Sequence, residues 1–506
     1  MNARLVTCLL LTALLSTTTR AERRQMEQIK TMELSDRLKL YDGEGGASCS
    51  EFMGNVLSWQ RRGGDWRDAS QQLFGDKPHS IAKSTEQTSV WDVSPMVRAL
   101  IMNGEQHASF FLRPVKSSGY IRFHSREARG VTDWPMLILE LSDGSREILK
   151  PSADSTLDCS SYKSIGRAET LDVSSQHNSV LQFILPTLQK GQTITRARLV
   201  LSKIISGGML NVGVFAIEKP KFPATAVIQG LAFEYSVDHD IERHPDVLFA
   251  TSFDESGNWQ SRWAKGAYGE TDIVGDDPSL RFSPLSGSAL RINLKKGSNL
   301  GFEARLKLKD HGGEPDELYF RYYLRLANDW NPNVASGKLP GMAGTYGEAG
   351  WGGRRVDGSN GWSLRGMFVR SFPKDHPMTG FTQLATYAYH AEMTGFYGDN
   401  WMWPGALLER NRWYSIEQYV RLNRPGVSDG VMRVWVDGRL AMERTKIRMR
   451  NVDRLHIETV WLNAYHGGAE TSPHDQHFYI DNVVVARRYI GPIGGISASN
   501  VNSIRK

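Results

Sequence analysis

Five side chains in the second half of the sequence could combine acid–base and electrostatic chemistry. Ser363 and Arg365 are two residues apart, and so are Tyr387 and Tyr389. In a strand, residues i and i+2 lie on the same face, so each pair would project from one side of a sheet. Arginine can offer a carboxylate two parallel hydrogen bonds, and a tyrosine hydroxyl can give or take a proton. Lys338, in a stretch bounded by glycine and proline that we expect to be a loop, could reach over this surface.

Each of these residues also has an ordinary structural explanation. A Tyr-x-Tyr pair is more often a half-buried aromatic pair, a single arginine a surface charge and a loop lysine a solvated one. The intervening residues, Leu364 and Ala388, are apolar and suit the packed face of a sheet. Taken together, the residues predict a polar, positively charged sheet face that suits an anionic partner.

The elements that would position these residues are short strands of an all-β protein. Apolar and polar residues alternate with a period of two, and glycine, aspartate, asparagine and proline bound the runs, which is typical of antiparallel sandwiches. The clearest runs are Tyr120–Phe123, Pro135–Leu141, Ala197–Leu201, Leu318–Leu326, Val431–Val436 and Phe478–Val485. Asp437-Gly438 between two such runs predicts a tight hairpin turn, since both residues tolerate positive φ angles.

The length of the chain and a stiff stretch near its middle predict two β-sandwich domains. The 506 residues exceed one ordinary domain, and a stiff lysine- and proline-rich stretch lies between Glu218 and His244. We therefore expect one sandwich over residues 41–219 and a second over residues 245–492.

The first 21 residues read as a signal peptide. Arg4 supplies a positive start, Leu5 to Leu15 an apolar core, and small residues surround a cleavage point near Ala21. A secreted or periplasmic protein follows, and Cys49 and Cys159, left after cleavage, suggest one disulfide. No apolar run approaches the roughly 20 residues of a membrane-spanning helix.

The positive net charge of the chain favours an acidic partner. The chain has 61 lysine and arginine residues against 55 acidic ones, a net charge of +6 that falls to +4 when the signal peptide removes two arginines. We find no lysine- or arginine-rich block and no nucleic-acid motif, so an acidic polysaccharide is favoured over nucleic acid.

From about Leu248 to Ile490, nearly half of the chain, the sequence resembles polysaccharide lyase family 14, which includes alginate and glucuronan-type lyases. The resemblance rests on the order and spacing of the segments Leu318–Arg325, Gly337–Gly341, Ser363–Arg365, Tyr387–Tyr389, Val434–Gly438 and Phe478–Val483. It implies a β-jelly roll with a catalytic cleft on its concave sheet. It also implies catalytic roles for Lys338, Ser363, Arg365, Tyr387 and Tyr389.

Such an enzyme cuts a uronate chain by β-elimination. A base removes the proton on carbon 5, the bond from carbon 4 to its oxygen breaks, and an unsaturated sugar remains. Arg365 or Lys338 would offset the growing negative charge, and a tyrosine whose pKa the cations lower would be base or acid. Lys338 as base stays open, and so does the choice between the tyrosines. Ser363 would bind the carboxylate or orient a tyrosine. No metal or other cofactor is required.

Other residues are expected near the sugar. Asn463 and His466 resemble a late polar segment of the family, and His390, although it points to the opposite face of a regular strand, is a candidate substrate-binding residue. Trp401-Met402-Trp403 is expected on a loop that walls the cleft. His474 and His477 are too loosely spaced to indicate a metal.

The first domain resembles DNRLRE-type domains, which occur beside polysaccharide-degrading modules. The resemblance rests on Trp91–Val97, Ile121–Ala128 and Ala197–Leu201, and the two halves occur in swapped order. It implies carbohydrate binding, without binding residues, and a structural spacer is the alternative.

Three other functions compete with an alginate lyase. A glucuronan lyase would use the same residues on a different polymer. A non-catalytic carbohydrate-binding or matrix protein would use the same cleft without turnover. A glycoside hydrolase needs two facing carboxylates, which the candidate strands lack.

Overall fold

The computed structural model describes residues 39–41, 46–54, 56–84, 87–115, 119–130, 133–160, 164–189, 191–208, 210–220, 229–254, 259–263, 268–468 and 470–493. The predicted signal peptide lies outside these residues. The described residues fall into two compact units. One contains residues 39–220 and Pro373–Pro377, and the other contains residues 229–372 and 378–493.

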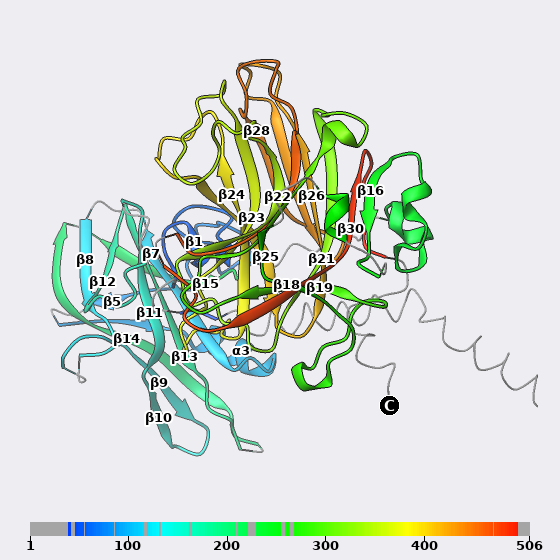
Figure 1. The fold of residues 1–506 in the computed structure, drawn as a ribbon. Helices are drawn as coiled ribbons and strands as arrows, with labels where there is room; N and C mark the ends of the chain where they lie inside the picture. The colour runs from blue at the N-terminus through cyan, green and yellow to red at the C-terminus, as the bar shows by residue number, and fades with distance from the viewer. Residues whose placement is uncertain are drawn as a thin grey trace, which may run out of the picture. The chain divides into compact units, whose positions relative to one another are not determined.

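The N-terminal unit is a sandwich of two antiparallel sheets (Figure 1). The first runs β10 (Arg146–Leu149), β9 (Met136–Leu141), β14 (Ile194–Gly208), β6 (Thr88–Asp92) and β5 (Lys83–Ser84), with β8 (Gly119–His124) beside β14 and β12 (Thr170–Ser174) beside β8. The second runs β11 (Pro151–Asp158), β13 (His177–Ile184), β7 (His107–Val115), β15 (Asn211–Ile217) and β3 (Trp66–Arg67), with β4 (Ser80–Ile81) beside β15. A small ladder joins β1 (Glu51–Met53) to β2 (Leu57–Ser58).

Alternating apolar side chains hold this sandwich together. Along β14, Ala197, Leu199 and Leu201 are fully buried, and they pack with Phe110 and Leu112 of β7 in one core. The helix α3 (Ser94–Met102), which the period-two pattern did not predict, follows β6 directly and starts with a proline at its first turn. Its buried face adds Met96 and Val97 to the same core.

The predicted disulfide is formed between Cys49 and Cys159, whose Cα atoms lie 5.0 Å apart. It joins the segment before β1 to the end of β11 across 110 residues of sequence. The cross-link therefore fixes an irregular part of the N-terminal unit to one of its sheets.

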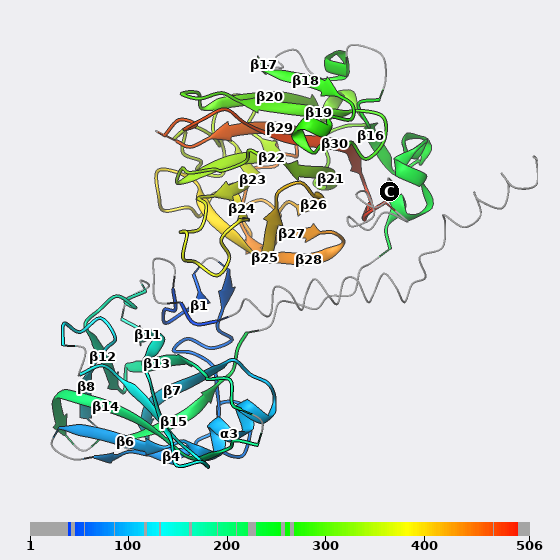
Figure 2. The same cartoon turned by 90° about the horizontal axis from the view of Figure 1, so that it is seen from below.

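The C-terminal unit is a jelly roll of two long antiparallel sheets, seen edge-on in Figure 2. The sheet away from the candidate site runs β18 (Thr271–Val274), β19 (Ala289–Leu294), β30 (Gln476–Ala486), β21 (Glu317–Leu326), β26 (Trp413–Arg421), β27 (Gly430–Val436) and β28 (Arg439–Ile447), with β16 (Val247–Thr251) beside β30. The sheet that carries the site runs β17 (Tyr268–Gly269), β20 (Leu300–Lys307), β29 (Thr459–His466), β22 (Ser336–Gly344), β23 (Trp362–Val369), β24 (Phe381–Tyr389) and β25 (Asp399–Glu409). Short 3-10 turns, η1 (Leu231–Glu234), η2 (Ser236–Asp238), η3 (Ile241–Arg243), η4 (Trp259–Arg262), η5 (Pro278–Leu280) and η6 (Leu308–Asp310), lie in the connections.

One continuous apolar core separates these two sheets. Leu339, Leu364 and Ala388 point into it from the site-bearing sheet, and Ile416 and Val434 meet them from the opposite sheet. Because side chains alternate along each strand, the polar neighbours of these residues are forced onto the outer face.

The all-β class predicted from the sequence is confirmed, and so are the six strand runs. The predicted hairpin is also present: Val436 pairs with Arg439, and Asp437 and Gly438 both have positive φ angles, 50° and 76°. In the described part of the chain, no helix is long and apolar enough to span a membrane.

Candidate active site

Strand register brings the two predicted pairs together on one face. Arg365 of β23 pairs directly with Tyr387 of β24, and Ser363 pairs with Tyr389. Both pairs lie on the face opposite the core, since Leu364 and Ala388 between them are fully buried. The i, i+2 expectation for these four residues is therefore met.

Lys338 joins this group from within a strand rather than from a loop. It lies in β22, and the expected loop position is wrong. Lys338 pairs with Met367 and Gly341 with Arg365, so three steps along β22 match two along β23, which is a β-bulge. Lys338 and Gly341 consequently share the outer face although they are three residues apart.

A side chain of the opposite sheet stabilises the bulge. Gln418, a fully buried residue of β26, donates from Nε2 to the carbonyl oxygen of Pro340 at 2.8 Å. The bulge turns that carbonyl inward, where it would otherwise lack a partner. Gly341 is required at the crossing, because a Cβ there would lie 2.3 Å from the carbonyl oxygen of Leu364.

At the centre of the site, the cationic groups of Lys338 and Arg365 both lie near the phenol ring of Tyr387. The Lys338 Nζ atom lies 4.2 Å from the centre of the Tyr387 ring, and the Arg365 guanidinium carbon lies 5.6 Å from it. Both cations are buried, 8% and 5% exposed, whereas Tyr387 is partly exposed. A single sugar ring resting on Tyr387 would therefore be within reach of both positive groups.

Burial and mutual repulsion shift the ionisation of this group. Burial, together with the positive charge of Arg365, lowers the pKa of Lys338 to about 8. Burial lowers the pKa of Arg365 to about 10. Burial and the neighbouring Tyr389 hydroxyl raise the pKa of Tyr387, so the prediction of a tyrosine with a lowered pKa is wrong for Tyr387.

A second layer of side chains fixes the Arg365 guanidinium. Its Nη1 donates to the Oδ1 atom of Asn463 at 3.1 Å, and its guanidinium carbon lies 4.5 Å from the centre of the Trp461 ring. Arg305 covers the same ring at 4.1 Å and is paired to Glu303 at 3.0 Å. Asn463, expected to contact sugar, is thus 3% exposed and holds the arginine.

Two backbone segments orient the tyrosine hydroxyls. The Tyr387 hydroxyl accepts from the backbone N–H of Gly398 at 3.2 Å, and the Tyr389 hydroxyl accepts from that of Gly353 at 3.1 Å. The two rings meet edge-on, 5.4 Å apart. The two hydroxyls also hydrogen-bond to each other, so this bond and the two backbone donors together orient the phenols.

Ser363 acts on the same arrangement indirectly. Its side chain is fully buried and donates to the carbonyl oxygen of Gly350 at 2.6 Å, which anchors the turn that reaches Gly353. Of the two roles expected for Ser363, this geometry fits the orientation of a tyrosine.

Two expected substrate-binding residues are not brought into the group. His466 is fully buried and lies 5.7 Å from the Phe368 ring, and burial lowers its pKa to about 4. His390 directly follows the last residue of β24, so the alternation expected for it does not apply, and it pairs with Asp399 at 2.8 Å. Its ring lies 5.2 Å from that of Trp401.

The expected cleft-wall loop at Trp401-Met402-Trp403 is wrong. These residues belong to β25, and both tryptophans are buried in the core. Two exposed aromatic residues that the sequence pattern did not single out, Phe396 and Tyr397, lie instead on the segment before β25. A Cβ on Gly353 would be 2.7 Å from the Phe396 ring, so this segment touches the turn that holds Tyr389.

Negative charge and metal ligands are scarce around the group. Among the described residues, neither Lys338 nor Arg365 forms an ion pair with a carboxylate, and Arg365 Nε has no hydrogen-bond partner. The described part of the chain contains no cluster of histidine, cysteine and acidic residues able to hold a metal ion.

Residues 277–483 match the family model described as Polysaccharide lyase 14. The match spans about two fifths of the chain and confirms the predicted resemblance there, together with the enzyme class, a polysaccharide lyase. The resemblance predicted for the N-terminal unit stays a prediction. Among curated proteins, none matches the chain.

Three solved structures illustrate the similarity. The alginate lyase Aly36B is 22% identical, with 42% of this chain and 86% of that chain covered and a TM-score of 0.34. A marine PL-14 alginate lyase from Aplysia kurodai is 22% identical, with 47% and 98% covered and a TM-score of 0.38. An endo-β-1,4-glucuronan lyase from the fungus Trichoderma reesei is 14% identical, with 47% and 95% covered and a TM-score of 0.34.

Proposed function

We propose that this protein is an exported lyase that cleaves an acidic uronate polymer, alginate first, by β-elimination. Residues 245–492 would form the catalytic domain and residues 41–219 a carbohydrate-binding domain, after a signal peptide at residues 1–21. The observation that carries the proposal is the placement of Lys338 and Arg365 against the same Tyr387 ring, without a carboxylate partner among the described residues.

The substrate class follows from that electrostatic imbalance. Buried charges are costly unless they are paired, and here two buried cations lie side by side. A uronate carboxylate would supply the missing negative charge. Arg365 would bind it, because its guanidinium is held over the Trp461 ring and its Nε donor has no partner among the described residues. The same contact would stabilise the extra charge that builds up on the carboxylate when carbon 5 loses its proton.

We assign Lys338 as the base. Its pKa of about 8 leaves a sizeable neutral fraction near neutral pH, which an ordinary lysine would not have. The neutral amine takes the proton from carbon 5, and the electron pair of that C–H bond forms the double bond between carbons 4 and 5. Solvent then removes the proton from the ammonium group before the next turnover.

We assign Tyr387 as the acid. Its raised pKa keeps the phenol protonated at neutral pH, and unlike Tyr389 it is partly exposed. As the bond from carbon 4 to oxygen breaks, the phenol donates its proton to that oxygen, which becomes a hydroxyl of the released chain. Water then restores the phenol proton, so the overall reaction consumes no water and no redox partner.

A glucuronan lyase is the second candidate, since a 1,4-linked glucuronate presents the same carboxylate, carbon-5 proton and leaving oxygen. The two polymers differ in the configuration of their sugars, not in the groups that Lys338, Arg365 and Tyr387 would contact. Substrate choice therefore has to be measured.

The test is a polymer panel with the full-length chain. Alginate, polyglucuronate and neutral dextran are incubated with the protein, the ultraviolet absorbance of the unsaturated product is followed, and the products are sized. We expect absorbance to rise with alginate and to stay flat with dextran. Shortening without a double bond would indicate hydrolysis, and binding without any shortening would indicate a non-catalytic protein; either result would overturn the proposal.

A further inference from the structure

The N-terminal unit contains a pocket of about 460 Å³ that the proposed chemistry does not use. Its lining combines three arginines, Arg61, Arg62 and Arg113, with Trp66 and the amides of Gln176 and Asn178. That size lies within the range of sites for small ligands, about 300–1,000 Å³. The lining offers positive charge, an aromatic face and amide groups in one place.

Two of the arginines are stacked around one indole ring. The Arg113 guanidinium carbon lies 4.1 Å from the centre of Trp66, and that of Arg61 lies 5.8 Å from it. Burial lowers the pKa of Arg113, and the charge of Arg61 adds to that effect. The two cations are thus held together although they repel each other.

Acidic compensation in the pocket is weak. Arg113 pairs with Asp76 at 3.4 Å, but the Asp76 side chain is 92% exposed, and an ion pair to so exposed a carboxylate contributes little. The net charge of the lining is therefore positive, and a bound anion would relieve the repulsion between Arg61 and Arg113.

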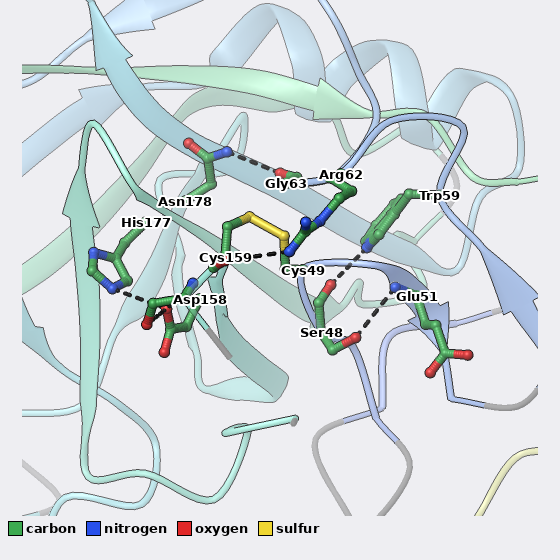
Figure 3. The surroundings of a disulfide bond; sticks show 11 residues. Ser48, Cys49, Glu51, Trp59, Arg62, Gly63, Asp158, Cys159, His177 and Asn178 are labelled. Carbon is green, nitrogen blue, oxygen red and sulfur yellow. Dashed lines mark hydrogen bonds and ion pairs between the residues drawn. A yellow bond between two sulfur atoms is a disulfide. The ribbon is translucent and has the colours of Figure 1, made fainter. Parts of the chain in front are cut away.

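The rim of the pocket is fixed before any ligand arrives. Asp65 accepts the backbone N–H groups of Gln60 and Arg61 at 2.7 and 3.0 Å. The Asn178 amide donates to the Gly63 carbonyl at 2.9 Å, and Arg62 donates to the Cys159 carbonyl at 3.3 Å, next to the disulfide (Figure 3). A preorganised loop loses little conformational entropy on binding.

We propose that this pocket binds one or two acidic sugar units of a uronate polymer, with Arg61 and Arg113 on a carboxylate and the amides of Gln176 and Asn178 on sugar hydroxyls. The identity of the polymer rests on the proposed function, whereas the site does not depend on turnover. Stacked arginines favour a flat carboxylate, and amides suit hydroxyl groups that a free inorganic anion lacks.

The experiment measures binding without cleavage. The full-length chain carrying Lys338→Ala is tested against an immobilised alginate tetrasaccharide and an immobilised polyglucuronate. The double variant Arg61→Gln/Arg113→Gln is made in this background. Its matched control is Arg146→Gln/Arg196→Gln, which removes two exposed arginines of the same unit that do not line the pocket. Circular dichroism and melting temperature verify that each variant folds.

We expect the double variant to bind about tenfold more weakly or worse, since each arginine lost removes a charge-assisted hydrogen bond, and the control to bind as before. Arg61→Glu alone, a change at an exposed position that leaves Arg113 and the indole in place, should weaken binding in the same direction. It keeps the test decisive if the double variant fails to fold.

Other results would overturn the proposal. Equal affinities of double variant and background would remove the pocket as a site, and equal losses in the double variant and the control would indicate diffuse attraction. Displacement by inorganic phosphate as effective as by free tetrasaccharide would indicate a simple anion site. Duplex DNA bound as tightly, with the same dependence on Arg61 and Arg113, would indicate a nucleic-acid site. A lack of lyase activity would leave all these measurements intact.

Discussion

The outer face of the jelly roll and the pocket of the N-terminal unit use the same pair of residue types differently. In both, a guanidinium lies on an indole ring, 4.5 Å for Arg365 on Trp461 and 4.1 Å for Arg113 on Trp66. On the jelly roll, neighbouring strands in fixed register carry the cations. In the pocket, Arg113 also lies in a strand, β7, whereas Arg61 and Arg62 come from a loop that hydrogen bonds and a disulfide tie down.

This difference suits the two regions to different tasks, proton transfer on the jelly roll and polymer binding in the pocket. Strand register sets the position of Arg365 relative to Tyr387 as firmly as backbone pairing allows, which proton transfer requires. Arg61 and Arg62, on a loop, have no strand register to set their distance from a reacting atom, but they are exposed, which is sufficient for holding a polymer. The comparison predicts that damage to the two regions affects different measurements.

The largest effect is expected from Lys338→Ala. Loss of a general base typically costs about 10²–10⁴-fold in rate, so turnover should fall by about a thousandfold. Polymer retention should fall much less than turnover, because the pocket is untouched. Initial rates on alginate and affinity for the immobilised tetrasaccharide supply the two measurements, with Lys309→Ala, an exposed lysine of η6, as control. A variant with near-normal turnover would refute Lys338 as the base.

The second-largest effect is expected on the stability of the N-terminal unit. Cys49→Ser opens a cross-link across 110 residues, and chain entropy predicts a loss of about 5 kcal/mol in the free energy of unfolding of the N-terminal unit. Thermal denaturation followed by calorimetry should show one transition shifted to lower temperature and a second unchanged. A downward shift of both transitions would mean that the two units do not unfold independently.

A pH profile sharpens the assignment of the base. Because Lys338 must be neutral to accept a proton and its pKa is lowered to about 8, the rate should rise about tenfold per pH unit below 8 and level off above it. Arg365→Gln removes a positive neighbour, so the pKa of Lys338 should rise and the acidic limb should move to higher pH. The profile of kcat for both proteins tests this, and an unmoved limb would assign the titration to another group.

The smallest effect is expected from the exposed aromatic pair beside the site. Phe396 and Tyr397 are each 63% exposed, with ring centres 5.1 Å apart, and could stack on a sugar beyond the reacting one. Aromatic contacts contribute about 0.5–1.5 kcal/mol, so Phe396→Ser/Tyr397→Ser should raise KM about two- to tenfold and leave kcat near its original value. Steady-state kinetics on long and short substrates separate the two, and a fall in kcat alone would contradict a binding role.

The sequence predicted the features that depend on local alternation. The pairs Ser363/Arg365 and Tyr387/Tyr389, the strand runs and the Asp437-Gly438 turn follow from a period of two and from turn chemistry, and the structure contains all of them. Their common face could be predicted because the apolar residues Leu364 and Ala388, between the members of each pair, indicate which side of the sheet is buried.

Features that depend on interruption of that alternation could not be predicted. Regular alternation from Gly341 would turn Lys338 toward the core, and only pairing with both neighbouring strands reveals the bulge. His466 lies on the core face because Ala464 and Leu462 precede it at buried positions, a parity that the sequence contains. At Trp401 and Trp403 the local signal was misleading. Glycine and proline nearby indicated a loop, but these residues form part of the strand β25.

The hydrogen bond from Gln418 to the Pro340 carbonyl makes the amine of Lys338 dependent on a residue that never meets the polymer. Exchanging Gln418 for leucine would keep every group of the site and yet free the bulge to migrate one position, which would point the amine inward. Loss of activity in a natural variant could therefore originate on the opposite sheet, with the reacting groups intact.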